Sequence, residues 1–267
     1  MRKVGFICLA LIFLFCLHTT ARQVPMNVRD TVTRFKVLSY NLRFGELASL
    51  EQLAQFIKEQ NPDIVALQEV DCRTFRERAP KQNDKDFATE LGFRTGMIPA
   101  YGKTIPYKGG YYGIAILSKY PLAKVERIYL PKTENGKEQR AVLVADVEYR
   151  EGKYITFAST HLDYTNTEER QVQVKKLNEI LLSQPYPVIV AGDFNAKPDA
   201  TEIHQGMSEW LLASNLSPTI PVSAPKSTID YIFCYTKQHW KKIEATTYNN
   251  ITLSDHLPIS SSIELEP

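Results

Sequence analysis

The sequence is poor in cysteine and lacks a bias toward charge of either sign, and both features restrict its class. It contains 267 residues with only 4 cysteines, 43% hydrophobic residues and 23% charged residues. So few cysteines exclude a disulfide-stabilised scaffold, and high apolar content with balanced charge excludes a disordered or collagen-like chain. No internal repeat and no linker rich in Pro, Gly or Ser divides the chain. The length therefore predicts a large folded domain with a sizeable core.

The first 21 residues are typical of a secretory signal peptide. They combine a short basic start, an apolar run and small residues that end at Ala21. The run of about 14 residues is shorter than the roughly 20 that cross a bilayer, which argues against a membrane anchor. Phe15 is bulky and argues against a lipoprotein anchor on Cys16. We therefore expect export to a periplasmic or extracellular space and a single mature domain over residues 22–267.

Removal of this segment leaves a nearly neutral chain. Arg2 and Lys3 are lost, so 32 − 2 = 30 basic residues face 30 acidic ones. The mature chain thus lacks the basic bias of non-specific nucleic-acid binders. Cys72 and Cys234 remain, and their distance in sequence leaves open whether they pair or stay as separate buried thiols.

Short apolar runs rich in β-branched and aromatic residues predict β-strands. They cover residues 34–40, 63–67, 113–117, 141–149, 154–159, 187–191, 230–235 and 259–265. Helical spacing predicts helices over 48–60, after an N-capping Asn166 with Glu169 completing a capping box, and over 201–213. Strands outnumber helices, and several lie too close for a helical crossover, which favours a mixed α/β fold with more than one sheet.

Polar residues gather where these strands end. Five places show this pattern, at Asn41, at Gln68-Glu69, at His161 to Asp163, at Asp193 to Asn195, and at Asp255-His256 before the last strand. Because ligand sites in α/β proteins favour strand termini, we expect these side chains to share one pocket.

The chemistry of these side chains points to phosphate esters. The acids and amides offer hard oxygen ligands, which suit Mg²⁺, Mn²⁺ or Ca²⁺ better than a structural zinc. His161 and His256 can supply protons or hydrogen bonds to a phosphate. Such a set suits attack of water on phosphorus assisted by a metal.

Seven motifs occur in the order of a known family and cover nearly all of residues 34–266. They are YNLRFG (40–45), LQEV (67–70), GIAILSKYP (113–121), STHLD (159–163), GDFNA (192–196), IDYIF (229–233) and SDHLPI (254–259). The chain thereby resembles the endonuclease/exonuclease/phosphatase superfamily, which includes DNase I, exonuclease III-type nucleases, neutral sphingomyelinases and inositol polyphosphate 5-phosphatases, and most closely its small secreted bacterial members. The resemblance implies a four-layer α/β sandwich, with two mixed β-sheets packed face to face, helices outside and one active site at one end.

The resemblance also implies a role for each site residue. Glu69 matches the principal metal ligand, with Asn41 and Asp255 beside the metal, which we expect to be Mg²⁺ or Mn²⁺. Asp193 matches the aspartate that orients or activates water, and Asn195 and His161 match phosphate-contacting groups. His256 matches the histidine at the scissile phosphate, oriented by Asp230. Whether Asp193 or His256 is the general base stays open.

Arg140 and the segment 105–112 are further candidates for substrate binding. Arg140 either contacts phosphate or is a solvated arginine. The segment, with Tyr107, Lys108 and Tyr111, is either a substrate-facing loop that stacks on a base, sugar or headgroup, or a plain connection.

Together these features predict an exported metal-dependent phosphodiesterase or phosphatase that acts on a small or lipid-linked phosphate ester. One alternative is a secreted nuclease of DNA or RNA, which needs an open groove with basic flanks instead of a closed pocket. A second alternative is a non-catalytic binding protein on the same scaffold. We expect a monomer without an obligate protein partner.

Overall fold

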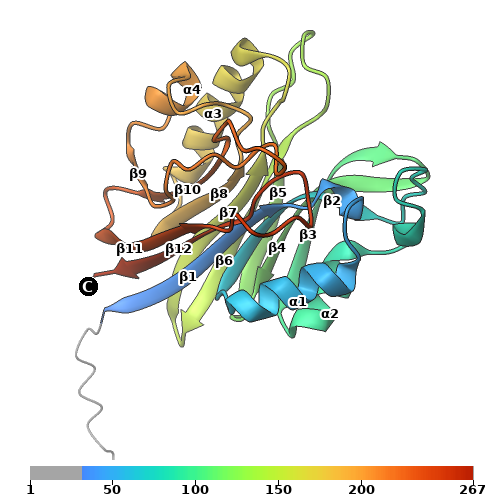
Figure 1. Ribbon diagram of the computed structural model, residues 1–267. Coiled ribbons are helices and arrows are strands. Elements are labelled where there is room, and N and C mark those ends of the chain that lie inside the picture. The colour runs from blue at the N-terminus through green and yellow to red at the C-terminus, as the bar shows by residue number, and fades with distance from the viewer. Residues whose placement is uncertain (1–31, 267) are drawn as a thin grey trace, which may run out of the picture. The chain divides into compact units, whose positions relative to one another are not determined.

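The computed structural model describes residues 32–266, which form two six-stranded sheets packed against each other (Figure 1). The predicted signal peptide lies outside the described residues. Within residues 32–266, no helix has both the length and the apolar character required to cross a membrane.

The first sheet contains β1 (Thr33–Asn41), β2 (Ile64–Cys72), β3 (Ile98–Tyr107), β4 (Gly110–Ser118), β11 (Trp240–Thr247) and β12 (Ile259–Leu265), in the order β11-β12-β1-β2-β4-β3. The second contains β5 (Leu122–Tyr129), β6 (Ala141–Arg150), β7 (Lys153–His161), β8 (Val188–Asp193), β9 (Trp210–Leu212) and β10 (Asp230–Tyr235), in the order β5-β6-β7-β8-β10-β9. The helices are α1 (Leu50–Gln60), α2 (Phe87–Thr95), α3 (Thr167–Leu181) and α4 (Thr201–His204), with short 3₁₀ turns η1 (Arg43–Gly45) and η2 (Pro80–Gln82).

Alternation along each central strand builds the layers. On β1, Phe35 and Val37 enter the core between the sheets, whereas Leu38 and Tyr40 face the α1 and α2 layer. On β8, Ile189 enters the same central core and its neighbours face the α3 and α4 layer. Strands covered on both faces must be apolar on both, which explains their continuous hydrophobic runs. The two helix pairs lie on opposite outer sides (Figure 1), so the predicted four-layer α/β sandwich is confirmed.

The strands that sequence analysis does not predict are β3, β5, β9 and β11, and each forms an edge of its sheet. Edge strands are exposed along much of their length, as in β5 and β11. They therefore carry charged residues where central strands carry apolar runs. Helix α2 was not predicted either.

Two predicted helical features are wrong. The helix expected over 201–213 ends at His204, because Trp210–Leu212 leaves the helical path and pairs with β10 as β9. Asn166 does cap α3, but Glu169 does not complete a capping box. The Glu169 carboxylate instead accepts hydrogen bonds from the Thr133 N–H and hydroxyl, which hold the preceding loop against the helix.

The two cysteines are separate thiols. Cys72 ends β2 in the first sheet, and Cys234 is buried in β10 of the second. Their pairing, which sequence analysis left open, does not occur in this structure.

Candidate active site

The two sheets bring their polar strand ends to one end of the sandwich. In the first sheet β1 and β2 are parallel and Asn41 pairs with Gln68, so Asn41 lies beside Glu69. The strand predicted over 63–67 continues to Cys72, so Glu69 lies within β2 and not after its end. β12 runs antiparallel to β1, so the residues just before it, Asp255 and His256, lie where β1 ends. The opposite chain directions thus gather residues from distant parts of the sequence.

The second sheet contributes its own set by the same rule. β7 and β8 are parallel, and His161 lies in register with Asp193. β10 runs antiparallel to β8 and begins at Asp230, which is also in register with Asp193. Asp193 therefore has a neighbour from each adjoining strand.

A bulge in β2 directs Glu69 toward the site. The pairing of β2 with β4 shifts register between Leu67 and Val70, and Glu69 has a φ of 54°. Asn195 has a φ of 50°. Non-glycine residues adopt this left-handed region rarely, and such strain concentrates where a side chain must be aimed at a functional site.

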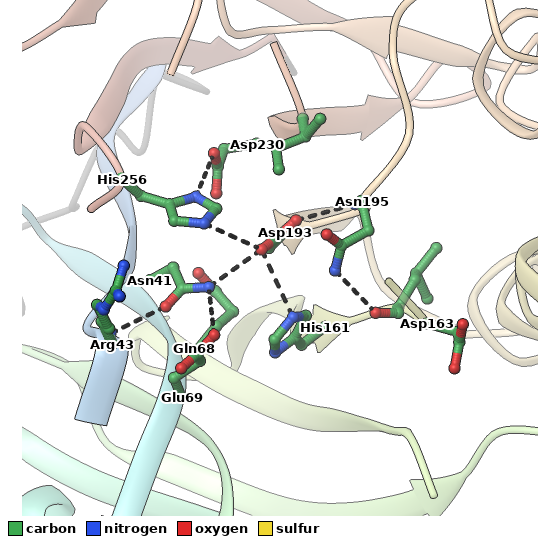
Figure 2. A network of polar contacts seen from close by, with 12 residues as sticks. Asn41, Arg43, Gln68, Glu69, His161, Asp163, Asp193, Asn195, Asp230 and His256 are labelled. Carbon is green, nitrogen blue, oxygen red and sulfur yellow. Dashed lines mark hydrogen bonds and ion pairs between the residues drawn. The ribbon is translucent and has the colours of Figure 1, made fainter. Parts of the chain in front are cut away.

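Asp193 is the centre of the polar network (Figure 2). Its Oδ2 accepts a hydrogen bond from Asn41 Nδ2 at 3.0 Å and lies 3.5 Å from His161 Nε2 and 3.7 Å from His256 Nε2. Its Oδ1 accepts from the Asn195 N–H at 2.9 Å. One carboxylate thus joins groups from both sheets.

Asp193 also has unusual acid–base chemistry. It is 1% exposed, and burial followed by the negative charge of Asp230 raises the pKa of Asp193 to about 7. A carboxylate with a pKa near neutrality can accept a proton from water and release it again. Burial, with the nearby charge of Asp255, likewise raises the pKa of Glu69.

His256 and Asp230 form a buried pair. His256 Nδ1 lies 2.9 Å from Asp230 Oδ2, and Asp230 also accepts from the Thr219 hydroxyl at 2.5 Å. Burial alone lowers the pKa of His256, but the charges of Asp230 and Asp193 outweigh it and raise the pKa to about 10. His256 is therefore held as a cation whose Nε2–H points to Asp193.

His161 has the opposite character. Arg140 Nη1 lies 3.2 Å from His161 Nδ1, and an arginine can only donate, so His161 accepts at Nδ1 and carries its proton on Nε2. Burial, with the positive charges of Arg140 and His256, lowers the pKa of His161 well below its usual value. The two histidines thus present a neutral and a charged N–H to the same carboxylate.

Asn41 and Asp255, both predicted beside a metal, are engaged differently. The Asn41 carbonyl oxygen accepts from the Arg43 N–H, and its Nδ2 donates to Glu69 Oε1 at 3.3 Å as well as to Asp193. Asn41 therefore holds the two carboxylates in place. Asp255 Oδ2 pairs with Arg43 Nη1. Its role as a metal-side carboxylate stays a prediction.

A metal ion could be held either by the cluster of Asp193, Asp230 and His256 or by Glu69. In the described part of the chain, ligand atoms of Asp193, Asp230 and His256 lie within 4.8 Å of one another. The direct bond between His256 and Asp230, however, already uses one ligand atom of each. Glu69 is better placed, since its Oε2 has no hydrogen-bond partner within residues 32–266 and its side chain lines the cavity described below.

The loop after β7 is organised by Asp163. Its carboxylate accepts from the N–H groups of Thr165, Asn166 and Lys137. Burial opposes ionisation of Asp163, but these hydrogen bonds outweigh it and lower the pKa. Asn195 Nδ2 donates to the Leu162 carbonyl at 3.0 Å, which ties this loop to β8 (Figure 2).

The network opens into a cavity of about 310 Å³. Its lining includes the predicted residues Glu69, Tyr107, Arg140, His161, Asp193, Asn195 and His256. Ile105 and Tyr112, the two ends of the candidate segment 105–112, also line it. Four further lining residues were not singled out for the site by sequence analysis, namely Phe44, Arg76, Glu138 and Tyr164. Arg140 is 2% exposed, so the alternative of a solvated arginine is wrong.

The segment 105–112 is a β-hairpin instead of an irregular loop, and its contact with substrate stays a prediction. Its residues end β3 and begin β4, with Lys108 and Gly109 at the turn and Tyr107 paired with Gly110. Because side chains alternate along a strand, only part of the segment reaches the cavity. Tyr111 instead lies under Lys103 and is 44% exposed, and Lys108 lines a neighbouring smaller cavity.

The sequence of the chain is similar to a family model and to individual known proteins. The family model described as "Endonuclease/Exonuclease/phosphatase family" matches residues 38–256. The Escherichia coli (strain K12) protein YbhP is 29% identical over 250 residues, covering 86% of this chain and 96% of that protein. Exodeoxyribonuclease III of Haemophilus influenzae is 26% identical over 195 residues, covering 68% of this chain and 66% of that protein.

A solved structure shows the same fold. The mannosyl-6-phosphatase of Bacteroides thetaiotaomicron superposes with a TM-score of 0.66 at 16% identity, covering 86% of this chain and 99% of that one. The match of the family model spans the strand ends that build the Asp193 network. The chain therefore belongs to the endonuclease/exonuclease/phosphatase family.

Proposed function

We propose that this protein is a divalent-metal-dependent hydrolase of a small phosphate ester, with Asp193 positioning the attacking water. The observation that carries the proposal is the convergence of His161, His256 and Asn41 on Asp193 Oδ2. Members of the family hydrolyse phosphate esters, and they include nucleases, phosphodiesterases and phosphatases. The choice among these substrates therefore depends on the cavity of this chain.

Asp193 is the general base in this proposal. Its raised pKa allows the carboxylate to take a proton from water near neutral pH. His256 is already protonated beside Asp230, so it serves as a hydrogen-bond donor and positive charge for the developing negative charge on phosphate. This assignment chooses between the two bases that the motifs leave open.

His161, Asn195 and Arg140 line the cavity around Asp193 and would hold the phosphate oxygens. Arg140 fixes the His161 tautomer so that its Nε2–H points into the network. Because Asn195 is anchored to the Leu162 carbonyl, its position needs no rearrangement on binding. Such preorganised donors stabilise charge without reorganisation during the reaction.

Glu69 fits a divalent cation such as Mg²⁺ or Mn²⁺. It offers a hard carboxylate oxygen at the cavity, and burial near Asp255 makes its negative charge costly without a cation. Bound there, the metal would neutralise phosphate charge and activate the ester toward water. Asn41 bonds both Glu69 and Asp193, so it couples the metal-side carboxylate to the base.

The flank of the cavity favours a small ester over a nucleic acid. The basic side chains that line the neighbouring smaller cavity are paired with acids, Arg76 with Asp71, Arg78 with Glu46 and Lys108 with Glu77. A polyanion gains most from unpaired basic residues that replace its counterions. The pairing therefore supports a substrate recognised within the cavity. We also propose, from the leader sequence, that the protein acts after export.

A metal-dependent hydrolysis screen tests the proposal. Purified protein would be assayed on bis-p-nitrophenyl phosphate, sugar and inositol phosphates, sphingomyelin, RNA and plasmid DNA, with Glu69→Ala as the blank. Turnover of small phosphate esters that is lost in the blank and in EDTA supports the proposal. Cleavage only of DNA or RNA would assign a nuclease instead. Turnover equal in the blank would contradict the site.

A further inference from the structure

Arg76 lies against a cluster of aromatic rings at the wall of the cavity. Its guanidinium carbon lies 4.0 Å from the ring centre of Phe44 and 4.2 Å from that of Tyr107, with Tyr112 at 5.3 Å. Only 12% of its side chain is exposed. These cation–π contacts and the burial of the side chain restrict the guanidinium, whose N–H groups remain available to other partners.

One edge of Arg76 is already used. Nε and Nη2 donate to the two oxygens of Asp71 at 2.5 and 2.9 Å, and Asp71 is itself buried and accepts from the Thr74 hydroxyl. A guanidinium has five N–H donors, so three remain after these two bonds, on Nη1 and Nη2. The structure gives Nη1 no hydrogen-bond partner within residues 32–266.

The remaining donors lie beside open space. Arg76 lines the same cavity of about 310 Å³ as Glu69, Asp193 and His256. It also lines an adjoining cavity of about 140 Å³, and Phe44 and Tyr107 border both. Arg76 therefore stands where a ligand that fills the catalytic cavity would extend away from the scissile phosphate.

We propose that Arg76 forms a second anion subsite, which binds a phosphate or carboxylate on the part of the substrate that is not hydrolysed. This inference rests on the proposed function and narrows it to bis-anionic small phosphate esters. The cation–π contacts with Phe44 and Tyr107 and the two hydrogen bonds to Asp71 pre-order the side chain, so an anion gains paired hydrogen bonds with little loss of side-chain entropy.

Binding is measured by calorimetry with Mg²⁺ in an Asp193→Asn background, so that the ligand is not consumed. The ligands are butyl phosphate, 1,4-butanediol bisphosphate and 4-phosphooxybutanoate. We expect a second anion to tighten binding about ten-fold or more. The comparison of the last two ligands tells whether phosphate or carboxylate is preferred.

Arg76→Gln is expected to abolish the advantage of the second anion and leave butyl phosphate unaffected, with Arg76→Lys intermediate because it lacks the fork. Arg73→Gln is the matched control, since Arg73 is paired with Asp84 and does not line either cavity. Because Arg76→Gln leaves Asp71 as an unpaired buried charge, Arg76→Gln combined with Asp71→Asn is measured in parallel.

The outcomes separate the subsite from the hydrolytic function. Equal affinity for the mono- and bis-anionic ligands, no binding of either, or a preference that survives in Arg76→Gln and in its combination with Asp71→Asn would overturn the subsite. A short single-stranded oligonucleotide is titrated into the same proteins. If Arg76→Gln weakens its binding but leaves the affinity for 1,4-butanediol bisphosphate unchanged, Arg76 contacts a nucleic-acid backbone and the small-ligand assignment is overturned. An Arg76-dependent preference in a protein that fails the hydrolysis screen would uphold the subsite and reject the hydrolase.

Discussion

His256 Nδ1 lies 2.9 Å from Asp230 Oδ2, and both side chains are buried. The bond fixes which imidazole nitrogen carries the free N–H, so that His256 Nε2 lies 3.7 Å from Asp193. One line of polar contacts, here called the relay, thus runs from Asp230 through His256 to Asp193. Asp193 ends β8, Asp230 begins β10, and His256 lies in the segment before β12.

The relay predicts graded effects of mutation. His256→Ala should lower kcat about 100-fold or more because it removes the charged donor. Asp230→Asn should cost less, since the imidazole remains but loses the charge that orients it and keeps it protonated. Both kcat and its pH profile are measured. Asp84→Asn, at an exposed carboxylate, is the control, and an equal loss there would contradict the relay.

Glu69→Ala and Asp193→Ala should each yield a folded protein with activity lowered about 100-fold or more. The reason is that the first removes the proposed metal ligand and the second the proposed base. Circular dichroism checks the fold, and steady-state kinetics with added Mg²⁺ separates the roles. Excess Mg²⁺ should not rescue Asp193→Ala. Turnover close to wild type in either variant would contradict its assignment.

Chelation should silence the enzyme, and Mg²⁺ or Mn²⁺ should restore it. A cation at Glu69 relieves repulsion in the folded state alone, so it should also raise the melting temperature. The melting temperature of the metal-free protein is measured with increasing Mg²⁺, beside Glu69→Gln. A shift of the same size in the variant would place the cation elsewhere.

The pH dependence of stability follows from His256. Its pKa is raised to about 10 in the folded protein, above the usual 6.5, so the folded state keeps a proton that the unfolded chain has lost between these values. The stabilisation is fully present below about pH 6.5 and disappears as pH rises toward 10, at up to about 1.4 kcal/mol per pH unit.

This dependence is measured by urea unfolding of the metal-free protein between pH 6.5 and 10, beside His256→Gln. We expect the difference in unfolding free energy between the two proteins to shrink across this range. A constant difference would show that His256 is neutral in the folded state.

Prediction from sequence succeeds for the central strands and fails at the edges. Strands such as β1 and β8 are covered on both faces, so burial imposes apolar residues that sequence analysis detects. The edge strands β5 and β11 are mostly exposed, so burial imposes no apolar pattern on them. The intrinsic β-propensity of their residues is too weak to identify them as strands. The helix predicted over 201–213 fails similarly, because pairing with β10 overrides helical spacing at Trp210.

Sequence analysis likewise finds some residues of the site and misses others. His161, Asp193, Asp230 and His256 stand at or just before strand ends, inside recognisable motifs, and the fold brings them together as expected. Glu69 joins them from a bulge within β2. Arg76 carries no such signal, because Arg73, Arg76 and Arg78 look alike in sequence. Only the packing of η1 and the β3–β4 hairpin around it shows which arginine faces the cavity.

The amino-acid sequence by itself determined the mixed α/β class, which depends on local apolar periodicity, and the polar side chains that gather near the ends of strands. Motifs of adjacent residues determined the family, and the resemblance to that family implied the layered sandwich. Tertiary structure alone decided how those side chains interact. The bulge that aims Glu69, the unequal pKa values of His161 and His256 and the pairing of the basic flank all arise from contacts between residues far apart in the chain. Burial and charge at such contacts depend on distances that only the folded chain defines.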